Sequence, residues 1–145
     1  MVSLTLVAHS DRLLGALVEM IVATTATPPP CSTAGGTEDG RMGTSLGRIR
    51  GALRAGLAAG DDGCLVLYDT GSAWLTIEFA IDELSAEERS RVVLSTGPLV
   101  EGALAAAVRA ADGAPLTEVA DAAASALERD KRPGDAPGDG TRLTA

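Results

Sequence analysis

The chain has 145 residues and a formal net charge of −8, and 46% of its residues are apolar while only 2% are aromatic. This length fits one domain that buries a core without disulfides or a structural metal. The negative charge argues against binding to nucleic acid or to anionic lipid, which both require a basic patch, and favours a protein partner with a basic face.

Apolar residues predict strands and helices that alternate along the chain. A run at residues 2–8 suits a buried strand, and the apolar spacing that follows it predicts an amphipathic helix that ends near Pro28–Pro30. A short second strand is expected at 31–34. A glycine-rich loop then leads to a helix whose N-cap is Thr44 or Ser45.

The second half of the chain continues this alternation. A third strand is expected at 63–68, and the apolar residues between 74 and 81 predict a third helix. A fourth strand at 91–95 precedes Pro98, which suits the first turn of a helix. Apolar residues between 116 and 127 predict a last helix with one apolar face.

Four strand–helix units predict an α/β fold, an open parallel sheet of about four strands with helices on both faces. We expect the strand order 2-1-3-4, the commonest doubly wound arrangement, in a single domain at residues 1–128. Residues 129–140 contain no large apolar side chain, so burial cannot offset the entropy of ordering them. Residues 129–145 are therefore expected to form a disordered tail.

The two cysteines, Cys31 and Cys64, are not arranged as a CxxC motif, and they are expected to be buried free thiols in a reducing compartment. No basic segment precedes an apolar stretch of signal-peptide length, and no apolar run approaches the ~18 residues of a membrane span. The sequence therefore predicts a cytoplasmic protein that does not bind the membrane.

His9, the only histidine, follows the first predicted strand, at the rim where open α/β sheets bind ligands. Asp69 follows the third strand, which neighbours the first in the order 2-1-3-4. A hydrogen bond from Nδ1–H to this carboxylate would leave Nε2 free as a nucleophile. Two alternatives remain open, a purely structural histidine and a carboxylate that only caps the helix before Ser72.

A second group of residues suits a phosphate. Glycines at four positions of the loop allow close approach of backbone amides, and the helix that begins after Thr44 and Ser45 adds partial positive charge. A plain turn-rich connection explains the loop equally well. A nucleotide P-loop is not supported, because the only lysine is Lys131 in the predicted tail.

Five segments are informative when taken together: Val7-Ala8-His9-Ser10, Gly35-Gly36-Thr37-Glu38-Asp39-Gly40, Gly43-Thr44-Ser45, Asp69-Thr70-Gly71-Ser72-Ala73 and Pro98-Leu99-Val100-Glu101-Gly102-Ala103. Together they resemble one family, the mannose-type IIA domains of the sugar phosphotransferase system, and within it the phosphotransfer subunit of PEP-dependent dihydroxyacetone kinase. The resemblance covers roughly residues 1–127. This sequence departs from the family pattern at Thr70, where leucine is usual, and at the Pro28–Pro30 run.

The resemblance implies a phosphohistidine carrier. His9 would accept a phosphoryl group from the phosphocarrier protein HPr and pass it to ADP bound in the nucleotide-binding subunit of the kinase, with Asp69 fixing the tautomer. The resemblance also implies a homodimer, and the mechanism requires neither a metal nor another cofactor. The residues expected to bind the phosphoryl group are Thr44, Ser45, Gly71 and Ser72.

Three alternatives remain. A sugar-specific IIA component would use the same chemistry but pass the phosphoryl group to a IIB domain during uptake. A regulatory module would have its phosphorylation state detected by a transcription factor. A flavodoxin-like binding domain would contain His9 only as a structural residue.

Overall fold

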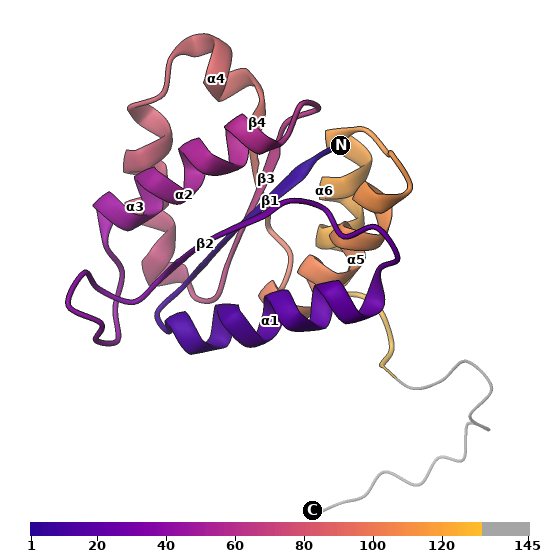
Figure 1. The fold of residues 1–145 in the computed structure, drawn as a ribbon, viewed down its shortest axis with the longest axis horizontal. Helices are drawn as coiled ribbons and strands as arrows, with labels where there is room; N and C mark the ends of the chain where they lie inside the picture. Colours follow the sequence, from indigo (N-terminus) through magenta and orange to yellow (C-terminus); the bar gives the residue numbers. More distant parts are fainter. Residues whose placement is uncertain (132–145) are drawn as a thin grey trace, which may run out of the picture.

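Four parallel strands form one sheet in the order β2-β1-β3-β4 in the computed structural model, which describes residues 1–131 (Figure 1). This arrangement confirms the predicted fold class and strand order. All six residues of β1 are buried, as expected for a central strand covered on both faces. The strands are β1 (Ser3–Ala8), β2 (Cys31–Gly35), β3 (Cys64–Tyr68) and β4 (Val92–Leu94).

The register of the strands determines which residues meet at the carboxyl edge of the sheet. Ala8 at the end of β1 pairs with Gly35 at the end of β2, and Val7 pairs with Tyr68 at the end of β3. The residues that follow these three strands therefore emerge at the same edge. His9 and Asp69 are two of them.

Helices cover both faces of the sheet, as predicted. The helices α1 (Asp11–Thr24), α5 (Leu99–Ala111) and α6 (Leu116–Ser125) pack on one face, and α2 (Leu46–Ala59) and α3 (Gly71–Asp82) pack on the other (Figure 1). Each face has its own aliphatic core, and the two cores are separated by the sheet. The core on the α1 side includes Leu6, Leu14 and Leu67, and the core on the α2 side includes Val7, Leu53 and Val66.

The helix α4 (Ala86–Ser90) was not predicted. It is a single short helix in the connection between α3 and β4. The Ser85 hydroxyl accepts a hydrogen bond from the Glu88 backbone N–H, and the Glu88 carboxylate accepts one from the Ser85 N–H, so both ends of a capping box are present. The sequence Ser-Ala-Glu-Glu carries this signal, although the helix contributes no buried residue.

The structure corrects the expected burial of one cysteine. Both thiols are free, as predicted, but only Cys64 is buried, whereas Cys31 is half-buried. Cys31 lies on β2, an edge strand, so a helix cannot cover it on every side. Burial still raises the pKa of the Cys31 thiol to about 11.

Two further expectations concern the tail and membrane-spanning helices. The predicted tail lies almost entirely outside the described residues, because only residues 129–131 of it are included. Within residues 1–131, no helix has both the length and the apolar character needed to cross a lipid bilayer.

Candidate functional site

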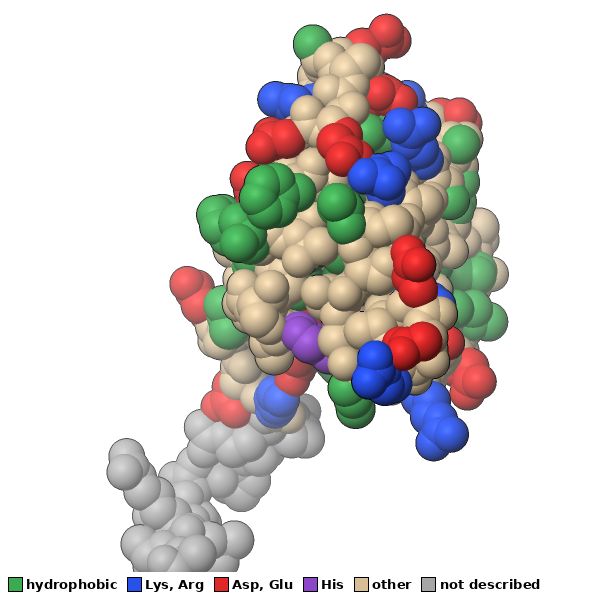
Figure 2. All heavy atoms as spheres, turned by 90° about the vertical axis from the view of Figure 1, so that its left-hand side faces the viewer, with side chains coloured by type: hydrophobic (Ala, Val, Ile, Leu, Met, Phe, Trp, Pro, Cys, Tyr) green, Lys and Arg blue, Asp and Glu red, His purple; other side chains and the backbone are tan. Residues whose placement is uncertain are grey.

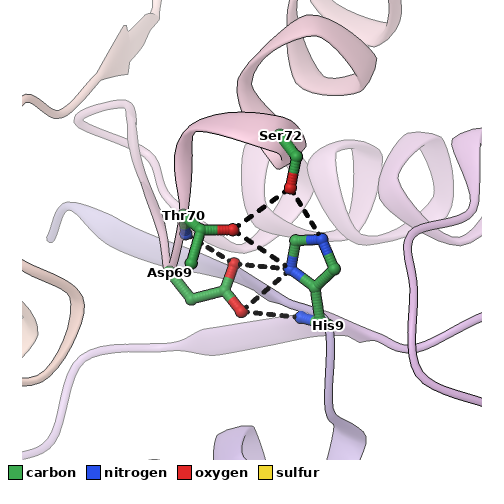
Figure 3. Close-up of polar contacts among 4 residues, drawn as sticks. All are labelled: His9, Asp69, Thr70 and Ser72. Carbon is green, nitrogen blue, oxygen red and sulfur yellow. Dashed lines mark hydrogen bonds and ion pairs between the residues drawn. The ribbon is translucent and has the colours of Figure 1, made fainter.

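His9 and Asp69 lie side by side at the carboxyl edge of the sheet, as the strand order predicts. Nδ1 of His9 is 3.0 Å from both carboxylate oxygens of Asp69 (Figure 3). The imidazole is 30% exposed, while the carboxylate is only 16% exposed. The anchoring group is therefore sheltered, and the ring that it holds reaches the surface, where Figure 2 shows it in purple.

The Asp69 carboxylate also accepts hydrogen bonds from two backbone N–H groups, one on each oxygen. Oδ2 accepts a hydrogen bond from the His9 backbone N–H at 2.9 Å, and Oδ1 accepts one from the Thr70 N–H at 2.7 Å. Burial raises the pKa of Asp69, but the hydrogen bonds from His9 and Thr70 outweigh it, so the pKa lies below its ordinary value. Asp69 is thus an anion at neutral pH.

These contacts define the tautomer of the ring. An ionised carboxylate can only accept hydrogen bonds, so Nδ1 must carry a proton and donate a hydrogen bond to Asp69. Nε2 lies 2.9 Å from Ser72 Oγ, and in the neutral ring its lone pair accepts a hydrogen bond from that hydroxyl. In the neutral form of the ring, the nitrogen that bears the lone pair therefore faces a serine hydroxyl.

The helix-cap interpretation of Asp69 is wrong. The N-cap of α3 is Thr70, whose side chain makes no capping hydrogen bond. The Thr70 hydroxyl instead lies 3.2 Å from Ser72 Oγ and 3.5 Å from Nδ1 of His9 (Figure 3). The departure from the family pattern at position 70 therefore adds a polar group beside the imidazole.

Of the four predicted phosphate-binding residues, the fold brings one, Ser72, into contact with His9 among residues 1–131. Ser45 caps α2, where its hydroxyl accepts a hydrogen bond from the Arg48 N–H and donates one to Glu38. Within residues 1–131, Thr44 and Gly71 neither bond to His9 nor line the cavity beside it.

The glycine-rich loop folds back onto the end of β1. The Gly36 N–H donates to the Ala8 carbonyl and the Gly43 N–H donates to the His9 carbonyl, each at 3.1 Å. Gly36 has a φ of +72°, and a Cβ there would lie 2.8 Å from the Arg41 carbonyl oxygen, so glycine is required. The loop thereby forms one wall beside the histidine.

A cavity of about 380 Å³ lies beside His9, between this loop and the start of α1. Its lining includes three arginines, Arg12, Arg41 and Arg48. Sequence reasoning did not identify them, although Arg12 follows His9 by three positions and Arg41 lies inside the loop that was singled out. Among residues 1–131, no three His, Cys, Asp or Glu side chains are grouped as ligands for a metal ion.

Comparison with known families gives a match over most of the chain. The family model described as the PTS system fructose IIA component matches residues 3–120. A solved structure, titled as the crystal structure of the unknown function protein EF1359, aligns with a TM-score of 0.73 and 29% identity. The alignment covers 86% of this chain and 95% of that one.

Several curated proteins that are similar in sequence share the name phosphoryl donor subunit DhaM of a PEP-dependent dihydroxyacetone kinase. The Pantoea ananatis protein is 40% identical over 131 residues, and the Escherichia coli protein is 37% identical over 133 residues. Each alignment covers 88% of this chain but only 27% of the relative. A protein of Listeria innocua is 36% identical over 109 residues, which cover 75% of this chain and 86% of the relative.

Proposed function

The chain belongs to the family of PTS system fructose IIA components, and from this membership we propose that it carries a phosphoryl group on Nε2 of His9. The contact between His9 and Asp69 is the observation that supports this role most directly. The contact keeps a proton on Nδ1, which leaves the lone pair of the neutral ring on Nε2. Residues 1–128 form the carrier domain in this proposal.

The proposed donor is the phosphocarrier protein HPr, and the proposed acceptor is ADP bound in the nucleotide-binding subunit of a dihydroxyacetone kinase. The names of the relatives support the kinase, because they are phosphoryl donor subunits of such systems. The matched alignment covers 86% of the Listeria relative, so a protein consisting of little more than this domain carries the same name.

Phosphoryl transfer requires a nucleophile, the phosphorus and a leaving atom in line, with little other covalent chemistry. Nε2 attacks the phosphorus as the bond to the donor nitrogen breaks, and the lone pair of Nε2 becomes the new N–P bond. Ser72 must first turn its hydroxyl away from Nε2, because the lone pair now accepts its proton. The turned hydroxyl can then donate to a phosphoryl oxygen.

Asp69 acts on the ring throughout this step. The imidazole gains positive charge as Nε2 forms its bond to phosphorus, and the carboxylate at 3.0 Å from Nδ1 stabilises that charge. The Nδ1 proton stays between the two groups, so no proton has to leave the site. The reverse reaction, transfer to the acceptor, uses the same contacts.

One further candidate function has an observation in its favour. The matching family model is described as a fructose IIA component, which would pass its phosphoryl group to a sugar-specific partner during uptake. The two functions share the chemistry at His9 and differ only in the acceptor. The names of the relatives favour the kinase.

The proposal includes a homodimer, as the family resemblance implies, and a cytoplasmic location, as the sequence predicts. Large apolar side chains are exposed on α1 and α5, including Met20, Val22 and Val108. On α3, Trp74 is 45% exposed and Phe79 is 56% exposed.

The test is incubation of the protein with phosphoenolpyruvate, enzyme I and HPr, followed by intact-mass measurement. We expect one acid-labile phosphoryl adduct on the wild type and none on His9→Ala or His9→Gln, with circular dichroism checking that both variants fold. The loaded protein is then offered a kinase nucleotide-binding subunit with ADP, or a IIB domain. An adduct that persists on His9→Ala would refute the assignment of the carrier residue.

A further inference from the structure

We propose that the cavity beside His9 is a binding subsite for a diphosphate group, held by Arg12, Arg41 and Arg48 next to the phosphorylated imidazole. The inference rests on the proposed function, in which His9 carries the phosphoryl group. It adds a ligand and three residues that neither the family pattern nor the names of the relatives assign.

The three arginines come from three separate segments that the fold gathers around one cavity. Arg12 lies in the first turn of α1, Arg41 lies in the loop before α2, and Arg48 lies in the first turn of α2. The net charge of the chain is −8, so this concentration of positive charge is a local feature. Three guanidinium groups around one cavity favour the binding of an anion there.

Two of the guanidinium groups pair with exposed carboxylates, and the third has no partner among residues 1–131. Arg48 Nη2 is 3.4 Å from Asp11 Oδ1, and Arg41 pairs with Asp39, whose side chain is 56% exposed. Arg12 has no ion pair or hydrogen bond within residues 1–131. Exposed pairs of this kind stabilise a protein very little, so an incoming anion can replace the carboxylates.

The size of the cavity favours a diphosphate over a single phosphoryl group. Its volume of about 380 Å³ lies at the lower end of the range for small-molecule sites and exceeds what one phosphoryl group fills. Guanidinium groups match the oxygens of phosphates through paired hydrogen bonds. Three of them suit a group that carries several negative charges.

The chemistry of transfer explains why such a subsite would be needed. A phosphoryl group leaving Nε2 of His9 for a phosphate oxygen brings two strongly negative groups together, and nearby cations must offset their repulsion. Transfer from a histidine of a donor protein brings only one such group to the site. The arginines should therefore matter more when the phosphoryl group leaves than when it arrives.

The first test is an NMR titration of the full chain with inorganic pyrophosphate, ADP and, as a dicarboxylate control, succinate. We expect pyrophosphate and ADP to shift the resonances of His9 and the arginine side chains. Arg12→Ala and Arg48→Ala should each weaken binding about fivefold, and the double variant about twentyfold. Arg54→Ala is the matched control, because Arg54 lies on α2 but does not line the cavity.

The second test separates this subsite from the carrier function. In single-turnover reactions, the double variant should lose about tenfold more rate in transfer to nucleotide-bound acceptor than in loading from HPr. Succinate binding as well as pyrophosphate, or equal losses in both half-reactions, would overturn the diphosphate subsite. A wild-type protein that never loads would refute the carrier function, while the titration would still decide the subsite.

Discussion

Replacing Asp69 with asparagine removes one charge and one acceptor from beside His9 while keeping the size of the side chain. The carboxylate now accepts hydrogen bonds from the His9 N–H, the Thr70 N–H and Nδ1 of the ring. The asparagine amide has one oxygen and one NH₂ group. At least one of these donors must therefore face the NH₂, which cannot accept its proton.

The magnitude follows from the contacts and their exposure. A hydrogen bond to a charged partner contributes about 1.5–3 kcal/mol, and the 30% exposure of the imidazole places this one in the lower half of that range. A loss of about 1.5–2 kcal/mol in the transition state slows transfer about 10- to 30-fold. The unpaired donor should also lower the free energy of unfolding by about 1–2 kcal/mol.

The assay is rapid-quench measurement of loading from HPr, with ¹⁵N NMR of the imidazole reporting which nitrogen carries the proton. A second measurement is the free energy of unfolding against pH. Because the pKa of Asp69 is lowered in the folded state, its contribution is present above the unfolded pKa of about 3.9 and is lost as the pH falls through the folded value. The asparagine variant should lack this acid-dependent loss.

Wild-type loading rates in Asp69→Asn, with the Nδ1–H tautomer retained, would refute the reasoning. That outcome would mean that the backbone holds the ring without the carboxylate. A variant that loads slowly but keeps its stability would refute only the stability estimate, because the two effects come from different hydrogen bonds.

Two further predictions concern Ser72 and the packing of α2. Ser72→Ala should change the loading rate by less than about fivefold, as measured by rapid-quench kinetics. The substitution removes one neutral hydrogen bond, which the lone pair of Nε2 must lose before attack in any case. Gly56→Ala should destabilise the fold by about 1–3 kcal/mol in urea unfolding, because a Cβ there would lie 2.4 Å from Thr5 Oγ1. Gly51→Ala is the matched control on the same helix, since no atom lies within 4 Å of its added Cβ, and it should stabilise by up to about 1 kcal/mol. Equal effects of the two glycine substitutions would contradict this account of the packing.

The sequence predicted the sheet and the His9–Asp69 pair for the same physical reason. Apolar runs define the strands, and the carboxyl ends of neighbouring parallel strands must meet at one edge. Once the order places β3 beside β1, the residues after Tyr68 and after Ala8 have little choice of position. No information about distant side chains was needed.

The sequence predicted the buried residues of the helices less well, because apolar side chains on a helix do not by themselves identify which of them face the sheet. Leu13 and Val22 fit the apolar spacing of α1, yet they are 40% and 56% exposed, and only Leu14, Leu17 and Ile21 are buried. Leu127 ends the run of apolar residues that predicts the last helix, but it is 67% exposed and lies beyond the end of α6.

The arginines of the cavity could not be identified from spacing alone. Their grouping depends on the path of the loop, which Gly36 turns back through a positive φ and which the Gly43 N–H ties to the His9 carbonyl. The sequence indicated that the loop is rich in glycine, and a connecting turn explained that equally well. Only the folded path brings Arg41 and Arg48 to the cavity beside the imidazole.

The two sides of the imidazole differ in a way that suits a carrier. Nδ1 is fixed by a sheltered carboxylate, whereas the contact of Nε2 among residues 1–131 is an exposed serine hydroxyl. A carrier must orient its nucleophile firmly but must not bind the phosphoryl group so tightly that release becomes slow. Strong cations in direct contact with Nε2 would stabilise the loaded state and slow the second transfer. Placing the arginines in the adjoining cavity instead lets them act on an arriving acceptor, so the charge that promotes release does not also hold the phosphoryl group back.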